Sequence, residues 1–434
     1  MSKKNKRKKC VQNRKPLISQ IAITKNYFDD YVKRIHKLLL LAGLEPSLFD
    51  ALSKRTKMHF MKFRHTPFRI CAEKDNTVPR YYLKFFNRAM TDYEKTSFYG
   101  DPKFNFTFLE YVTYGLSFIM TLRHCKPSED RLPLDQFELL DKIKVPLLKY
   151  VAANTDDHYA VRTNFLMKSL FMYVTQPNYR YYTCKESGVA NMSKARVDNL
   201  ITVSSFEPER KNFFIDGELH SSYRLGYYLL GEEANDLNPV MAEIPMQLLE
   251  EKNSTNMKQI VNQIKTTITL PVYIQNHALH RFAERMDNMN NMFRNTIFSV
   301  SFMVPGVVTS AKGQRLIRAM HVTGKNIGYF PFIKQDGAIL LLSFLPLASP
   351  ITPEGSLLHK ELKLQLEDSK YIGLDKLSFY TKTDFDTVPI LRDALKKAGM
   401  WHLTEIEPET PTEKKEDQIL KNFFQYNYDI IEQE

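Results

Sequence analysis

The sequence predicts an α+β protein, in which an irregular helical N-terminal half is followed by a small antiparallel sheet packed with a histidine-bearing amphipathic helix. Three observations predict this class. Helical periodicity recurs without a fixed period up to about residue 200, Asp-Gly pairs separate apolar runs beyond it, and residues 271–293 join a strand pattern to an amphipathic helix. The length of 434 residues and a hydrophobic content of 43% indicate two or three domains with sizeable cores.

The formal net charge of +12 is concentrated at the start of the chain. Residues 1–20 contain eight basic and no acidic residues, which leaves a charge of about +4 for the remainder. We predict a basic disordered tail here, able to contact RNA, DNA or anionic surfaces without sequence preference. The alternative is that this tail binds nothing and only increases the solubility of the protein. The candidate nucleic-acid-binding residues of the tail are Lys3, Lys4, Lys6, Arg7, Lys8 and Lys9.

Residues 21–200 are predicted to form a helical domain. Its first helix, over residues 24–43, has Thr24 as an N-cap and Gly43 at its end. Within the domain, residues 54–69 interleave basic and aromatic side chains, as in surfaces that bind single-stranded nucleic acid. No RNA-binding motif accompanies them, so an amphipathic segment with buried Phe residues is favoured. Further helical patterns cover residues 79–93, 106–123, 133–153 and 161–174.

Residues 201–265 are predicted to be a connector that contains a hairpin. Phe213, Phe214 and Ile215 precede an Asp-Gly pair at 216–217, and a second apolar run follows it, which is the pattern of a tight β-hairpin. Residues 252–265 have a helical pattern.

Residues 266–404 are predicted to be an α+β domain with helices on one face of a mainly antiparallel sheet. Its hairpin has a turn at 334–337, and its last helix ends at Gly399. The predicted order is a strand at 268–274, a helix at 277–293, a strand at 296–304, a basic piece at 312–318, strands at 327–333 and 338–345, and a helix at 388–398. Residues 405–434 are predicted to be an acidic linker and an apolar terminal segment, which docks onto its own chain or onto a protein partner.

The helix at 277–293 carries the most specific chemistry. His277, Arg281, Glu284 and Arg285 are spaced to form one polar stripe over two turns, and the apolar residues fall on the opposite side. A histidine can act as general acid or base near neutral pH, and two arginines can hold a phosphodiester. These groups suffice for metal-independent cleavage of RNA, whose 2′-hydroxyl is a built-in nucleophile, with Glu284 in support.

The same residues resemble the helix of the barnase–EndoU–colicin–RelE class of small ribonuclease toxins and their relatives. The resemblance lies in the string His277-Ala278-Leu279-His280-Arg281-Phe282-Ala283-Glu284-Arg285. It implies a helix packed on a small antiparallel sheet, with His277 and Arg281 catalytic or phosphate-binding and Arg285 supporting them.

Two other interpretations of this helix remain open. His277, His280 and Glu284 have a one-turn spacing that suits a metal ion, but Arg281 between them would repel a divalent cation, so we predict no metal site. The polar stripe can also be an ordinary solvated face, on which Glu284 pairs with His280 or Arg281.

The remaining features of the sequence indicate the compartment of the protein and whether it needs a membrane or a cofactor. The four cysteines lie far apart, without C-x-x-C spacing, which favours a reducing cytoplasm. Neither a secretory signal nor an apolar run of membrane-spanning length is visible, so we expect no membrane association. No cofactor motif occurs. The predicted function is RNA binding, with metal-independent endoribonuclease activity in the C-terminal domain as its candidate chemistry; the alternative is a non-enzymatic scaffold or interaction protein.

Overall fold

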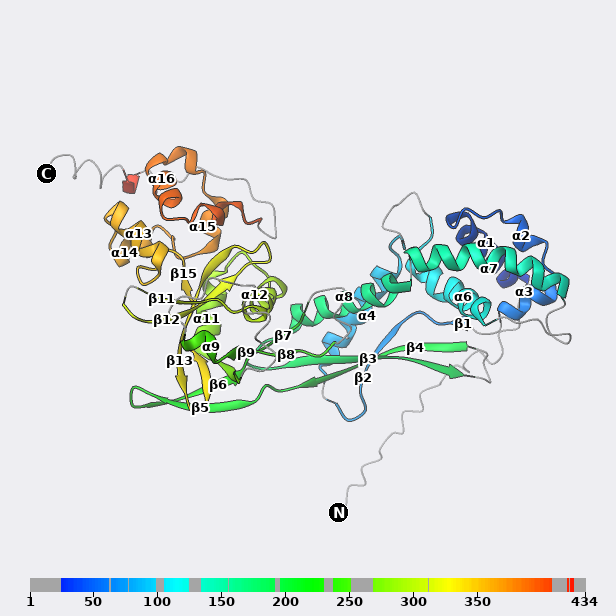
Figure 1. Ribbon diagram of the computed structural model, residues 1–434, viewed down its shortest axis with the longest axis horizontal. Coiled ribbons are helices and arrows are strands. Elements are labelled where there is room, and N and C mark those ends of the chain that lie inside the picture. The colour runs from blue at the N-terminus through cyan, green and yellow to red at the C-terminus, as the bar shows by residue number, and fades with distance from the viewer. Residues whose placement is uncertain are drawn as a thin grey trace, which may run out of the picture. The chain divides into compact units, whose positions relative to one another are not determined.

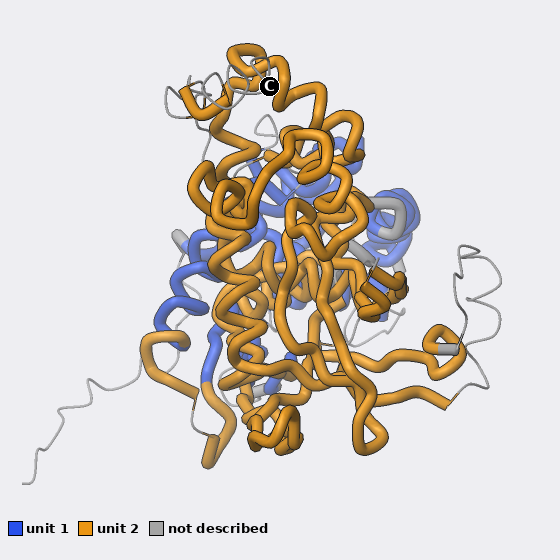
Figure 2. Tube along the Cα trace, turned by 90° about the vertical axis from the view of Figure 1, so that its left-hand side faces the viewer, with its two compact units in different colours: residues 1–71, 83–159, 186–202 blue, residues 72–82, 160–185, 203–434 orange. Residues whose placement is uncertain are grey.

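The computed structural model describes residues 25–61, 64–76, 78–98, 105–124, 134–154, 156–191, 196–229, 237–250, 268–310, 312–407, 420 and 422–424. They form a mixed α+β structure that divides into two compact units (Figure 2). Unit 1 comprises residues 1–71, 83–159 and 186–202, and unit 2 comprises residues 72–82, 160–185 and 203–434. The basic tail, and with it Lys3, Lys4, Lys6, Arg7, Lys8 and Lys9, lies outside the described residues, as does the helix predicted at 252–265.

Nine helical elements lie between residues 25 and 174 of the described chain. The first helix, α1, ends before Gly43, whose φ of 72° lies in the left-handed region that favours glycine at a helix end. The helices of this half are α1 (Lys25–Leu41), α2 (Ser47–Asp50), α3 (Lys54–Phe60), α4 (Arg80–Glu94), α5 (Phe108–Glu110), the π-helix η1 (Tyr111–Gly115), α6 (Leu116–Arg123), α7 (Leu134–Asn154) and α8 (Asp156–Val174).

This half also contains a sheet that the sequence analysis does not predict. Its strands are β1 (Arg64–His65), β2 (Arg69–Ala72), β3 (Tyr181–Asn191) and β4 (Arg196–Phe206), and β4 pairs with the other three. Residues of β4 alternate between buried and half-buried over much of its length, which is the period-two pattern of a strand. In the basic and aromatic segment, Phe60 and Phe68 are buried, which agrees with the interpretation as core.

Unit 2 is built on a sheet that is larger than the sequence predicts. Among the described residues it has nine strands, with the central order β11-β12-β13-β14-β10-β6-β5, while β15 pairs with β13 and β9 with β10. All of its strand pairs are antiparallel except β10 with β14. The strands are β5 (Arg210–Ile215), β6 (Glu218–Arg224), β9 (Glu243–Pro245), β10 (Thr269–Gln275), β11 (Val307–Thr309), β12 (Arg315–Met320), β13 (Asn326–Gln335), β14 (Ala338–Leu341) and β15 (Leu345–Pro346).

Both predicted hairpins are confirmed. Asp216 and Gly217 join β5 to β6, and Asp336 and Gly337 join β13 to β14. All four residues have positive φ, as a tight two-residue hairpin turn requires. The first hairpin is part of the nine-stranded sheet, because β6 pairs with β10, and is therefore not a separate connector.

The region after β10 differs from the prediction. The helix predicted at 277–293 is two helices, α11 (Asn276–Arg285) and α12 (Asn291–Met303), so that the strand predicted at 296–304 is wrong. Asn290 begins the second helix, since its side chain accepts a hydrogen bond from the backbone N–H of Phe293 at 3.0 Å. Arg294 caps the end of the first helix, since its Nη2 donates to the Met286 carbonyl at 3.1 Å.

The C-terminal helices lie together beside β15 (Figure 1). The predicted last helix corresponds to α16, and Gly399 follows it with φ 73°. The remaining elements of unit 2 are the short strand pair β7 (Gly226–Tyr227) and β8 (Val240–Met241), α9 (Gln247–Glu250), α13 (Pro353–Leu362), α14 (Leu366–Tyr371), α15 (Leu377–Lys382), the 3-10 helices η4 (Phe385–Thr387) and η5 (Trp401–Glu405), and α16 (Pro389–Lys397).

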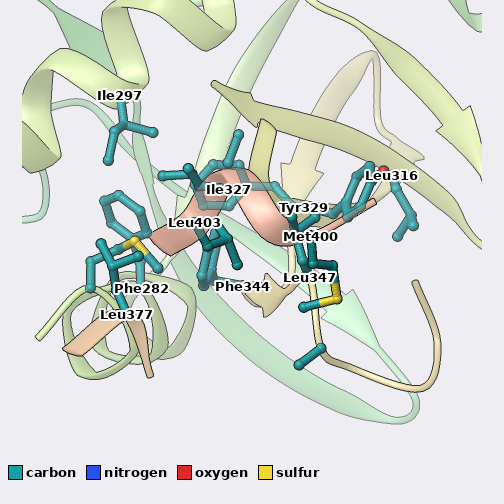
Figure 3. Packing of buried hydrophobic residues seen from close by; sticks show 14 of the residues in the cluster. Phe282, Ile297, Leu316, Ile327, Tyr329, Phe344, Leu347, Leu377, Met400 and Leu403 are labelled. Atoms are coloured by element: carbon teal, nitrogen blue, oxygen red, sulfur yellow. The ribbon is translucent and has the colours of Figure 1, made fainter. Parts of the chain in front are cut away.

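One hydrophobic core joins these elements. Phe282 of α11 lies within it, with its ring centroid 5.0 Å from that of Phe344 and 5.1 Å from that of Phe298, and Figure 3 shows its surroundings. Leu420 and Phe424 of the terminal segment are also buried in this core. The described part of that segment therefore docks onto its own chain.

Candidate functional site

The strand β10 and the core position the helix α11. The strand lies between β14 and β6, and the helix begins at the residue that follows it. Ala278 and Phe282 are buried against the core, which turns the opposite face of the helix outwards. Of the polar residues predicted from the sequence, His277, Arg281 and Glu284 share an accessible side of α11, whereas the Arg285 side chain is only 13% exposed.

His277 and His280 are both exposed. Within the part of the chain that the structure describes, neither imidazole has a hydrogen-bond or ion-pair partner. His277 is the second residue of α11, where backbone N–H groups and the helix dipole favour an anion. Both side chains are thus available for a ligand or a proton.

The two arginines of the stripe contact carboxylates. Arg281 Nη1 donates to Glu284 Oε2 at 2.9 Å, and these side chains are 43% and 47% exposed. The pairing of Glu284 with Arg281 is one of the two pairings that the sequence predicts, the other being with His280. Arg285 donates to Asp375 instead, in a pair whose side chains are only 13% and 15% exposed.

The pKa values of the two acids shift in opposite directions. Burial alone would raise the pKa of Glu284, but the guanidiniums of Arg285 and Arg281 outweigh it and hold that pKa below its usual value. Burial raises the pKa of Asp375, and Arg285 offsets part of the rise. Glu284 is consequently ionised at neutral pH and balances the charge of Arg281.

A cavity of about 340 Å³ opens on the neighbouring flank of α11. It lies between α11, α12 and the turn at residues 176–180. His280 lines it, whereas His277, Arg281, Glu284 and Arg285 do not. Its other lining residues are Gln176, Pro177, Asn178, Leu279, Phe282, Ala283, Asn291, Arg294, Asn295 and Phe298.

Asparagine side chains hold the walls of this cavity together. Asn178 Nδ2 donates to Asn276 Oδ1 at 2.7 Å, which fixes the turn against the start of α11. The amide nitrogen of Asn291 donates to the Thr175 carbonyl at 2.6 Å, and that of Asn295 to the Met172 carbonyl at 2.8 Å. These contacts fix α12 against the end of α8.

The sequence analysis does not identify the residues of α12 as part of a site. Asn291, Arg294 and Asn295 fall where one helix was predicted to end and a strand to begin, so no common face could be assigned to them. The available signal was Asn290, whose residue type favours a helix N-terminus at this position. Asn178 carries no local signal at all, because its role depends on Asn276, which is far from it in the chain.

Two further findings bear on the kind of site. Among the described residues, no group of three or more His, Cys, Asp or Glu side chains could hold a metal ion, the set His277, His280 and Glu284 included. No helix in the described ranges is both long enough and apolar enough to cross a membrane.

The fold and the site together define a mixed α+β protein with a candidate surface for a polar or anionic ligand on α11 and α12. No protein-family model, curated protein or solved structure matches the chain.

Proposed function

We propose that unit 2 binds RNA over the exposed side of α11 and the adjoining start of α12, and that His277 gives this surface metal-independent endoribonuclease activity. The observation that carries the proposal is a pair of exposed imidazoles on one helix beside a cavity: His277 and His280, neither of which has a partner among the described residues. An accessible imidazole can exchange protons with a bound ligand.

The chemistry needs only groups that α11 offers. The 2′-hydroxyl of RNA attacks the adjacent phosphorus, its proton passes to a base, and the P–O5′ bond breaks as the 5′ oxygen gains a proton. We assign the proton transfers to His277. Arg281 is one turn away and 43% exposed, so it can transfer hydrogen bonds from Glu284 to a phosphate.

Arg285 has a different role in this proposal from the phosphate contact that its position in the stripe predicts. Its guanidinium is mostly buried against Asp375. We therefore assign Arg285 to positioning: it ties the last turn of α11 to the segment before α15 and fixes the helix that presents His277. Glu284 remains in support, as the partner of Arg281.

A non-enzymatic interaction protein is the second candidate, and one observation favours it. Both arginines of the stripe are paired with carboxylates, so the exposed face of α11 has little net positive charge with which to hold a phosphodiester. In that case the same surface binds a ligand without cleaving it.

Incubation of the full chain with RNA in EDTA separates these candidates. We expect cleavage that is lost on His277→Ala, and retained on His220→Ala, which removes a histidine of β6 outside the site. Cleavage that survives His277→Ala contradicts the enzymatic proposal. Absence of cleavage, together with no RNA binding or RNA binding that depends only weakly on salt, supports the second candidate.

A further inference from the structure

Two short segments of unit 2 combine tyrosine with arginine. The first, residues 80–82, has the sequence Arg-Tyr-Tyr and forms the start of α4. The second, residues 179–182, has the sequence Tyr-Arg-Tyr-Tyr and leads from the turn at residues 176–180 into β3. Neither segment contains an acidic residue, so their two arginines give them a formal charge of +2.

Buried contacts hold the two segments against each other. The ring centroids of Tyr82 and Tyr182 are 5.8 Å apart in an edge-on arrangement. Tyr182 is 1% exposed, and its backbone N–H donates to the Tyr228 hydroxyl at 2.8 Å. In the turn, the backbone N–H of Tyr179 donates to the Gln176 carbonyl at 2.8 Å. The remaining side chains of the segments are therefore carried by a fixed frame.

Two tyrosines of these segments remain accessible. Tyr81 is 63% exposed and Tyr179 is 50% exposed. The ring centroid of Tyr81 lies 4.1 Å from that of Tyr82. Partial burial raises the pKa of Tyr82 to about 12, and Tyr81 and Tyr179 add to this rise, which indicates that the three phenols are neighbours. Water thus reaches two aromatic rings in one small region of the surface.

Cationic side chains accompany the two exposed rings. The Arg180 guanidinium carbon lies 5.2 Å from the ring centroid of Tyr179, within the range of a cation–π contact. Arg80 is exposed at the start of α4. Aromatic rings with cations beside them are the combination that holds single-stranded nucleic acid, because bases stack on the rings and the cations follow the backbone. We call Arg80, Tyr81, Tyr82, Tyr179 and Arg180 the aromatic surface.

The position of the aromatic surface favours RNA over a protein partner. Asn178 Nδ2 donates to Asn276 Oδ1 at 2.7 Å, which joins the turn to the first residue of α11. Tyr179 follows Asn178 in the chain, and His277 follows Asn276. Because consecutive residues are only about 3.8 Å apart, Tyr179 and His277 belong to adjoining parts of the surface.

We infer that Tyr81 and Tyr179 stack against unpaired bases of the RNA strand that α11 binds, and that Arg80 and Arg180 contact its phosphates. The inference rests on the proposed RNA binding and adds the class of substrate, which is single-stranded RNA. Every base has a flat face, so stacking of this kind tolerates many sequences. In a duplex the bases stack on one another, and they are not available to the tyrosines.

The test measures the affinity of the full chain for a fluorescently labelled oligouridine by anisotropy. All variants carry His277→Ala in addition, so that the proposed cleavage does not consume the probe. Tyr81→Ala and Tyr179→Ala should each weaken binding about tenfold. Tyr81→Phe and Tyr179→Phe keep the ring and should retain the affinity. A duplex RNA of the same length should bind more weakly than the single strand.

The matched control is Tyr371→Ala. Tyr371 is 70% exposed on α14 and does not belong to the aromatic surface, so its loss should leave the affinity unchanged. Tyr81→Leu and Tyr179→Leu separate stacking from apolar contact, because leucine is apolar but has no ring. We expect these two variants to bind as weakly as the alanine variants.

The outcomes distinguish the inference from the function on which it rests. Unchanged affinity in both alanine variants, full affinity in the leucine variants, or equal affinity for the duplex overturns the inference and leaves RNA binding standing. Tyrosine-dependent binding by a chain that does not cleave RNA supports the inference and overturns the endoribonuclease activity. Absence of oligouridine binding to the unmodified chain overturns both.

Discussion

Arg281 and Arg285 are one turn apart on α11, yet they lie in different environments. Arg281 and its partner Glu284 are nearly half exposed, whereas Arg285 and Asp375 are mostly removed from water. Exposed pairs contribute little to stability because water screens them, but a buried charge that loses its partner is strongly unfavourable. The two pairs should therefore respond very differently to the loss of one member.

Asp375→Ala should lower the free energy of unfolding by about 3 kcal/mol, because it removes the nearer and more buried carboxylate of the Arg285 guanidinium and leaves only Glu284 Oε1, at 3.9 Å. Urea denaturation measures this change. The matched control is Glu284→Ala, which removes the exposed pair and should cost at most about 1 kcal/mol. Equal losses in the two variants would contradict the difference in environment.

At the residue scale, the sequence predicts partners that are near in the chain and not those that are distant. The bond between Arg281 and Glu284 follows from three-residue spacing on a helix. Asp375 belongs to a segment some 90 residues further on, so no local pattern could show that it pairs with Arg285. The same holds for Asn178 and Asn276 at the cavity.

Among the secondary-structure elements, α12 shows how burial hides a helix. Residues 295–299 are all buried, so the helix lacks the polar face that normally reveals a period of 3.6 residues. Its β-branched and aromatic residues then resemble a buried strand. The amphipathic α11, by contrast, was recognisable because it has one buried and one exposed side.

The N-cap residue of α12 should contribute more to the free energy of unfolding than the N-cap residue of α11. Asn290→Ala should lower the free energy of unfolding by about 1 kcal/mol, since it removes the side-chain acceptor for the Phe293 N–H. Gln275 occupies the equivalent position before α11 and makes no such bond, so Gln275→Ala should have a smaller effect. Thermal or urea unfolding of both variants checks the comparison.

A histidine of β1 should make the stability of the protein depend on pH. His65 of β1 shares a hydrogen bond of 3.1 Å with Asn199 of β4, and burial lowers the pKa of His65 below its usual value. A lowered histidine pKa means that the unfolded chain binds a proton more readily. The stability that His65 contributes is therefore complete above pH 6.5 and is lost as the pH falls through its folded-state pKa.

We expect the free energy of unfolding to fall between neutral pH and about pH 5. His65→Gln keeps a polar side chain at this position, but glutamine does not titrate in this range. The decrease in the free energy of unfolding between the two pH values should therefore be smaller in this variant. Urea denaturation at the two pH values measures it. An unchanged pH dependence in the variant would show that other groups are responsible.

At the scale of the whole molecule, unit 2 is assembled from separate parts of the chain. Its core includes Phe282 of α11, Phe344 near β15, and Leu420 and Phe424 of the terminal segment. The sequence predicts the apolar terminal segment and the α+β class, because both follow from composition and periodicity. It does not predict that residues 160–185 join this unit, since that depends on contacts made only in the folded state.

Leu420→Ala and Phe424→Ala should each lower the free energy of unfolding of unit 2 by roughly 2 to 5 kcal/mol, because both side chains are almost fully buried in the core. Asn422→Ala is the control, since its side chain is exposed. Wild-type stability of the first two variants would instead indicate that the segment serves a partner protein. Chemical denaturation provides the measurement.

The dependence of α12 on the end of α8 limits how the chain can be dissected. A protein expressed from residue 203 or 266 onwards would lack the carbonyl groups of Met172 and Thr175, and Asn291 and Asn295 would lose the acceptors that orient them. It would lack Asn178 as well, and thus one wall of the cavity that His280 lines. Such a truncated protein could keep the nine-stranded sheet and still fail to recognise its ligand, so a negative result from it would say nothing about the intact protein.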